Sequence, residues 1–210
     1  MFLPMNVPLY EFQLPLEIVP TLITDILQIK GGQNSGTNIL KHMGTADKNF
    51  SYFNPELFSF LEGYLSEISA DHYRPEAKLS ITECWGTINH KFQRHHRHTH
   101  PNSILSGIIY LTDSEAATEF YLDNPWHWSE SVIQTAKEGF NKVICKVTPS
   151  AGKVIIFPSN IEHGTAANLS NDKRITLSFN SFISGNIGRE STYLDITSKS
   201  VKDAYKSNLQ

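Results

Sequence analysis

The chain has 210 residues, of which 40% are hydrophobic and 19% charged, and its formal net charge is −3 at pH 7. This length suffices for one domain with its own hydrophobic core, and the composition is that of a globular chain rather than a disordered one. The slight acidic excess gives no general attraction to phosphate backbones or anionic lipid, so we expect neither nucleic acid nor a membrane as a partner.

The N-terminus carries prolines at positions 4, 8, 15 and 20 and no basic residue before them, so we expect no signal peptide. Residues 9–14 are expected to be extended, and residues 16–29 place apolar side chains at helical spacing. Residues 31–49 contain four glycines without a sustained period, which predicts a long irregular loop that could act as a lid. A second helix should begin after Asn54 as its N-cap, with Pro55 at its first position.

From Lys78 onward the pattern changes to short runs typical of strands. These runs are residues 79–89, 104–112, 119–122, 142–147, 153–157 and 174–183. We therefore expect a mainly β fold with N-terminal helices, in which the strands form an antiparallel sandwich or barrel. The whole chain, 1–210, is expected to be one domain, with helical support in residues 1–77, a core in 78–185 and a tail in 186–210.

Four of the nine histidines stand within residues 95–100. Alternate residues of an extended chain share a face, so His96, His98 and His100 should point one way and His95 the other. Two imidazoles two residues apart can hold one iron, zinc, copper or nickel ion. His163, which follows a strand and a turn, is the best candidate for a third ligand, and either His96 and His98 or His98 and His100 could be the pair. The alternative, a solvated loop and an ordinary rim histidine, accounts less well for the density of the cluster.

The last predicted strand has one polar face throughout, formed by Arg174, Thr176, Ser178 and Asn180. If its apolar face packs against the protein, the polar face lines an interior where an unpaired arginine is costly. An anionic ligand would pair that arginine, and its planar fork matches a carboxylate, so a small dicarboxylate is the expected ligand. A strand whose polar face meets solvent is the other interpretation.

A second strand would bring hydroxyl groups to the same pocket. Ser106, Ile108 and Tyr110 share one face, and the two hydroxyls could bind a carboxylate, although a tyrosine taken alone is more often a packed aromatic than a ligand contact. On the opposite face, Gly107 indicates the close approach of another element.

Three segments resemble the superfamily of 2-oxoglutarate- and iron(II)-dependent oxygenases, and within it a group from bacteria and their phages. They are HRHTHPNSILSGIIYL at 96–111, GKVIIFPSNIEHG at 152–164 and RITLSFN at 174–180, together with the upstream Trp85 and Asn89. The resemblance implies a double-stranded β-helix, a jelly-roll or cupin-like barrel, with iron(II), 2-oxoglutarate and dioxygen as cofactor and cosubstrates. It also assigns His98, His100 and His163 to the metal and Arg174, assisted by Tyr110, to the distal carboxylate. The remaining residues expected in the cosubstrate pocket are Asn89, Ser106, Thr176 and Ser178.

The sequence departs from the wider superfamily at His100, which stands where an acidic ligand is usual. Three neutral ligands would leave the site more positive. The function implied is a hydroxylase that decarboxylates 2-oxoglutarate to succinate while it oxidises an unidentified small molecule or peptide, with specificity set by loops 31–49 and 124–142. Because we expect neither a signal peptide nor a membrane span, we expect a cytoplasmic protein. The second loop contains an aromatic cluster at residues 125–128. A cupin-like module that binds a metal or small ligand without turnover is the alternative, and Arg174 with Tyr110 favours the enzyme.

The two cysteines, Cys84 and Cys145, match no metal-binding or redox spacing. We therefore expect two buried free thiols in a reducing compartment.

Overall fold

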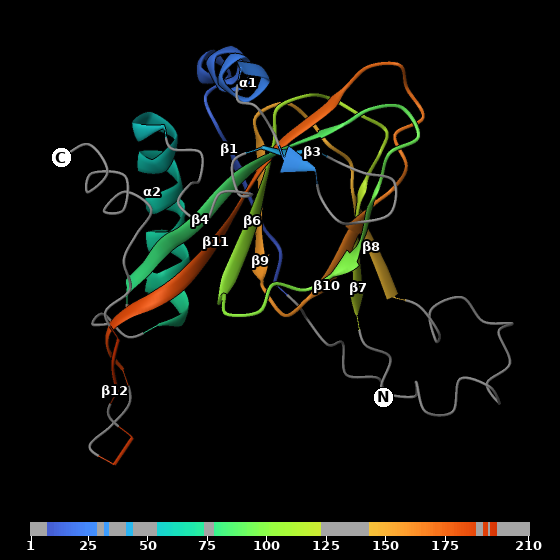
Figure 1. Cartoon of the computed structure of the whole chain (residues 1–210). Helices are drawn as coiled ribbons and strands as arrows, with labels where there is room; N and C mark the ends of the chain where they lie inside the picture. The colour runs from blue at the N-terminus through green and yellow to red at the C-terminus, as the bar shows by residue number, and fades with distance from the viewer. Residues whose placement is uncertain are drawn as a thin grey trace, which may run out of the picture.

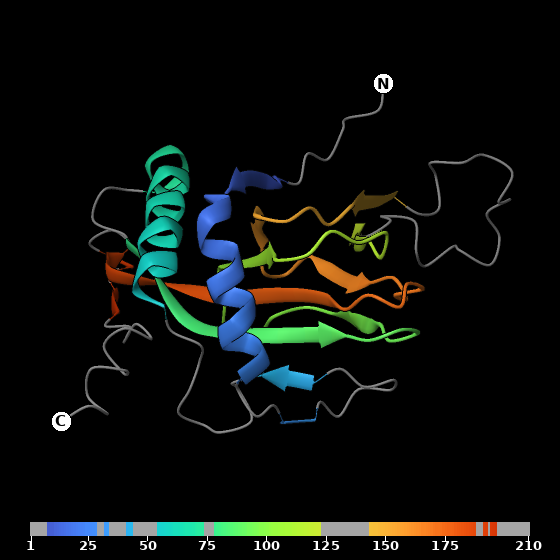
Figure 2. The ribbon, with the colours of Figure 1, turned by 90° about the horizontal axis from the view of Figure 1, so that it is seen from above.

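The computed structural model describes residues 8–28, 32–33, 41–43, 54–73, 78–122, 143–187, 191–192 and 194–196. Within these ranges two antiparallel sheets face each other, and two helices cover the outer face of the larger sheet (Figures 1 and 2). The helices are η1 Leu16–Ile18, α1 Val19–Gln28 and α2 Pro55–His72. The strands are β1 Tyr10–Gln13, β2 Gly32–Gln33, β3 Lys41–Met43, β4 Lys78–Asn89, β5 His95–His98, β6 Leu105–Tyr110, β7 Thr118–Leu122, β8 Val143–Val147, β9 Lys153–Pro158, β10 Glu162–Thr165, β11 Arg174–Ile187 and β12 Leu194–Ile196.

The larger sheet has the order β1-β9-β6-β11-β4-β3-β2, with β12 paired to β11, and the smaller sheet has the order β5-β10-β7-β8. β1-β9, β9-β6, β6-β11, β11-β4, β5-β10 and β10-β7 pair strands from distant parts of the chain, whereas β2-β3, β7-β8 and β11-β12 pair consecutive strands. This arrangement of two facing antiparallel sheets is the expected double-stranded β-helix.

Two apolar clusters hold the layers together. The larger one lies between the helices and the outer face of the larger sheet, where Leu22, Ile26, Leu57 and Leu61 are fully buried. The smaller cluster lies between the sheets and comprises Ile108, Tyr110, Phe120, Ile155 and Phe157. The helices pack on the outer face of the larger sheet, and residues on its inner face line a cavity.

The helix predictions are confirmed within one or two residues. Asn54 caps α2, since its side-chain oxygen accepts a hydrogen bond of 3.0 Å from the backbone N–H of Leu57. Gly107 permits the close approach that its sequence position indicated, because a Cβ at this residue would lie 2.1 Å from the ring of Phe179. No helix in the described part of the chain is both long enough and apolar enough to cross a bilayer.

Two predicted loops and one of the two cysteines differ from expectation or lie outside the described residues. Segment 31–49 is not wholly irregular, because β2 and β3 extend the larger sheet beyond β4; its other residues, and with them its use as a lid, lie outside the described part. The 124–142 loop with its aromatic cluster also lies outside it. The expectation of two buried thiols is wrong for Cys145, which is exposed on β8, the last strand of the smaller sheet, whereas Cys84 is buried in the core.

Candidate metal centre and anion pocket

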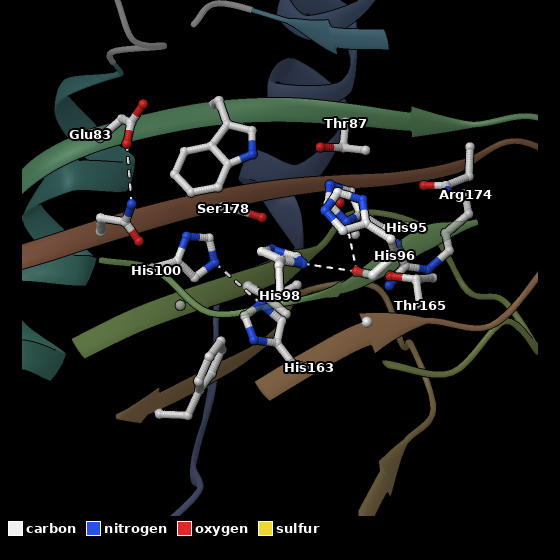
Figure 3. Close-up of a pocket in the computed structure, with 18 residues that line it drawn as sticks. Glu83, Thr87, His95, His96, His98, His100, His163, Thr165, Arg174 and Ser178 are labelled. Atoms are coloured by element: carbon white, nitrogen blue, oxygen red, sulfur yellow. Dashed lines mark hydrogen bonds between the residues drawn. The ribbon is translucent and has the colours of Figure 1, made fainter. Parts of the chain in front are cut away.

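A cavity of about 300 Å³ opens between the two sheets (Figure 3). The polar faces of two paired strands form one wall, in the register Arg174 opposite Asn89, Thr176 opposite Thr87, Ser178 opposite Trp85 and Asn180 opposite Glu83. The polar face of the last predicted strand therefore lines the interior. Four histidines from β5 and the residues after it, together with His163 from β10, form the facing wall.

The strand that carries the histidines does not follow a simple alternation. His98 pairs with His163 and His95 pairs with Thr165, so three residue steps on β5 match two on β10. Such a bulge shifts the phase of the side chains that precede it. His95 therefore also lines the cavity, and the expectation that it points away from His96 and His98 is wrong.

Two overlapping sets of three histidines have ring nitrogens within 4.8 Å of one another. One is His98, His100 and His163, and the other is His95, His96 and His98. The first set is the more buried and is the one that contains His163. Neither set includes a carboxylate among the described residues, so the acidic ligand usual in such sites has no counterpart here.

The tautomers of the first set suit a metal. The Nδ1 atoms of His98 and His163 lie 2.9 Å from the backbone carbonyls of His96 and Ile161. Hydrogen bonds of this kind fix the proton on Nδ1 and leave Nε2 with its lone pair directed inward, as is usual for metal-binding histidines. The Nε2 atoms of His100 and His163 lie 3.2 Å apart, so both rings direct a nitrogen to the same region.

Electrostatics favour the neutral form of all three rings. Burial lowers the pKa of His98. Burial, with repulsion from His163, lowers the pKa of His100 to about 3, and burial with repulsion from His98 lowers that of His163 to about 4. Neutral imidazoles in contact are ready to bind a divalent cation without first losing protons at pH 7.

Arg174 is buried, with 3% of its surface exposed, and no carboxylate of the described residues pairs with it. Its guanidinium donates from Nε to the carbonyl of Ala116 at 3.1 Å and from Nη2 to the hydroxyl of Thr118 at 3.0 Å. Burial lowers its pKa to about 10, which still leaves a cation at pH 7. A fixed cation with unused donors in a cavity is a binding site for an anion.

Of the other residues proposed for the pocket, some line the cavity and some lie behind its wall. Asn89 is 1% exposed and neither atom of its side-chain amide has a hydrogen-bond partner among the described residues, so both atoms are available to a ligand. Thr176 and Ser178 line the cavity. Tyr110 does not line it, but its hydroxyl donates to Thr118 at 2.8 Å and its ring lies 5.5 Å from the guanidinium carbon of Arg174. Ser106 lies behind the wall, hydrogen-bonded to neighbouring side chains.

Sequence reasoning gave no role to several residues of the cavity. Glu83 and Thr87 line the same wall as Asn89, and Thr118 holds both Arg174 and Tyr110. The alternation of Glu83, Trp85, Thr87 and Asn89 was a usable signal, because it repeats the polar alternation of the strand on which Arg174 stands. Only the pairing of the two strands reveals that they form one wall.

Comparison with known families agrees with this geometry. Residues 83–180 match the model of a family described as "Putative 2OG-Fe(II) oxygenase". The matched segment runs from β4 to β11 and contains every residue that lines the cavity. A search of curated proteins found no match.

Many solved structures are similar to this chain in fold, among them the following three. The first is SnoN from nogalamycin biosynthesis, a non-heme alpha ketoglutarate dependent epimerase, with a TM-score of 0.58, 12% identity and coverage of 83% of this chain and 78% of that one. The second is a prolyl-4-hydroxylase of Pseudomonas putida, with a TM-score of 0.58 and 12% identity; the match covers 83% of this chain and 93% of that one. The third is HygX of Streptomyces hygroscopicus, solved with nickel and 2-oxoglutarate. Its TM-score is 0.58 and its identity 11%, and the match covers 83% of this chain and 82% of that one. At these identities the likeness establishes the double-stranded β-helix fold.

Proposed function

We propose that this chain, whose residues 83–180 belong to the family of 2-oxoglutarate- and iron(II)-dependent oxygenases, is a hydroxylase that binds iron through His98, His100 and His163. One observation carries the proposal. The same cavity holds three neutral histidines in contact and, on its other wall, a buried arginine without an anionic partner among the described residues. The first feature suits a divalent metal and the second suits a carboxylate, and 2-oxoglutarate joins both requirements in one molecule.

The donor set fits iron(II), because imidazole is a good ligand for this ion and three protein ligands leave positions for other groups. Iron(II) with 2-oxoglutarate and dioxygen supplies the oxidising power that converts a C–H bond to C–OH, with succinate and carbon dioxide as the coproducts. Three neutral ligands would leave the charge of the ion uncompensated by protein, so an anionic cosubstrate gains affinity from the metal as well as from Arg174.

The chain's own residues bind and orient the reactants. Arg174 would receive the distal carboxylate of 2-oxoglutarate, and Thr118 holds the guanidinium in place from behind. The amide of Asn89, opposite Arg174 in the sheet, has both its donor and its acceptor available for the same ligand. Ile108 and Phe157 give the cavity an apolar surface that limits access of water.

The reaction type is tested by dioxygen consumption and succinate formation with iron-loaded protein. Both should depend on 2-oxoglutarate, and slow turnover should occur even without the oxidised substrate. Protein loaded with zinc is the control and should be inert. Absence of both signals from iron-loaded protein would favour a metal-binding module without turnover.

A further inference from the structure

Glu83 is a charged residue of the cavity to which the proposed chemistry gives no role. Apart from the histidines, Glu83 and Arg174 are the only ionisable side chains among the described residues that line the cavity. Glu83 belongs to neither histidine set, so it is not placed to complete the metal site. The cavity thus contains one carboxylate and one guanidinium that do not neutralise each other.

The two charges lie at opposite ends of the cavity. Glu83 pairs with Asn180 and Asn89 pairs with Arg174, so six residues of paired strand, about 20 Å at roughly 3.3 Å per residue, separate the backbone positions of Glu83 and Arg174. Figure 3 shows His98, His100 and His163 between the two ends. If Arg174 binds the cosubstrate, the end that contains Glu83 remains for the molecule that is oxidised.

The carboxylate of Glu83 is held in a defined orientation. It accepts a hydrogen bond of 3.1 Å from Nδ2 of Asn180, whose Oδ1 accepts one of 2.8 Å from the hydroxyl of Ser106. Ser106 in turn lies 2.8 Å from the hydroxyl of Ser159, which donates to Ser103 at 2.7 Å. Because a carboxylate accepts hydrogen bonds, Asn180 presents its Nδ2 donor to Glu83, and its Oδ1 is left to accept from Ser106. A bulge in β4 at this point, between the pairs of Asn180 and Ser181, helps to set the direction of the side chain.

No lysine or arginine of the described residues lies within ion-pair distance of Glu83. Trp85 lines the same wall two residues further along β4, and its ring centroid lies 5.6 Å from that of His100. A carboxylate beside an indole ring is the combination that binds organic cations, through an ion pair and a cation–π contact. Trp85 also links the Glu83 end of the cavity to the histidines.

We infer that Glu83, oriented by Asn180 and assisted by Trp85, binds an ammonium or guanidinium group of the substrate, which makes the substrate a small organic cation. The inference rests on the proposed function, because Arg174 must take the cosubstrate for the other end to be the substrate site. Glu83 is then the residue that determines specificity, and Asn180 is a positioning residue.

The test measures binding rather than turnover. The background variant Trp126→Phe/Trp128→Phe keeps Trp85 as its single tryptophan, so quenching of indole fluorescence reports on the cavity. Nickel- and 2-oxoglutarate-loaded protein is titrated with n-pentylammonium and agmatine, and with 1-pentanol and pentanoate as neutral and anionic counterparts. We expect both cations to bind about tenfold or more tightly than 1-pentanol, and pentanoate to bind least.

Glu83→Gln should abolish the preference for cations, and Glu83→Asp should keep part of it. The matched control Glu11→Gln removes an exposed carboxylate paired with Lys153 and should change nothing. Thermal melting of each variant establishes that it is folded. Equal affinity of the parent for n-pentylammonium and 1-pentanol would overturn the inference, as would a cation preference that survives in folded Glu83→Gln.

Calorimetry of 2-oxoglutarate binding separates this inference from the proposed function. If 2-oxoglutarate binds and cations show no preference, only the role of Glu83 is wrong. If 2-oxoglutarate does not bind the nickel-loaded parent, the proposed function is wrong, and with it the assignment of the Glu83 end to a substrate.

Discussion

Replacing Arg174 by alanine should weaken 2-oxoglutarate binding by one to two orders of magnitude. The guanidinium is 3% exposed and, among the described residues, donates one hydrogen bond from Nε and one from Nη2, so its remaining donors are available to a carboxylate. A hydrogen bond to a charged group contributes about 1.5–3 kcal/mol, and about 1.4 kcal/mol corresponds to a tenfold change in Kd. Arg174→Lys should recover only part of the loss, because an ammonium keeps the charge without the planar fork.

The assay is calorimetric titration of 2-oxoglutarate into nickel-loaded protein, with nickel content measured in parallel. Nickel affinity should barely change, because Arg174 belongs to neither histidine set. Lys146→Ala, which removes an exposed cation paired with Glu119, is the matched control and should bind like the parent. If folded Arg174→Ala bound 2-oxoglutarate as well as the parent does, the assignment of the anion pocket would be refuted.

Three further predictions concern the metal site, the pH dependence of stability and the thiols. His163→Ala and His100→Ala should each weaken iron(II) binding more than tenfold, whereas His96→Ala should keep it; the opposite result for His100 and His96, by metal analysis, would move the site to the other histidine set. The pKa values of His100 and His163 lie at about 3 and about 4, below the ordinary value of 6.5, so the unfolded chain takes up protons first as the pH falls. The contribution of these two histidines to the free energy of unfolding is therefore most favourable above pH 6.5 and is progressively lost as the pH falls toward 4. Between pH 7 and pH 5 each of the two histidines should lower the free energy of unfolding of the metal-free protein by roughly 2 kcal/mol. Urea unfolding in chelator measures this loss, and a pH-independent free energy would contradict it. Iodoacetamide should alkylate the exposed Cys145 and spare Cys84, whose pKa is raised by burial; mass spectrometry of peptides would contradict this if Cys84 reacted in the folded protein.

Much of the fold could be predicted because its signals are local. The N-cap at Asn54 depends on a hydrogen bond three residues away, and the polar alternation from Arg174 to Asn180 is a property of one strand. The bulge in β5 could not be predicted, since it arises from the pairing with β10 and is not encoded in the alternation of residues 95–100.

The site was predictable where chemistry distinguishes residues and not where tertiary pairing decides their role. Histidine density and a strand arginine indicated a metal and an anion before any contact was known. The alternation that begins at Glu83 was a weaker signal, because only the pairing of Glu83 with Asn180 places it in the cavity. Ser106 was expected in the pocket as a hydroxyl donor, whereas its hydroxyl is used within the wall that orients Asn180.

The proposed function requires one cavity to hold both iron(II) and 2-oxoglutarate. Anaerobic titration of the protein with iron(II) and then 2-oxoglutarate, followed by visible absorption, tests both at once. We expect a weak charge-transfer band that appears only when both are present and that saturates at one of each per chain. No band in protein that has bound iron(II), or an unchanged band in Arg174→Ala at limiting 2-oxoglutarate, would contradict the proposed function.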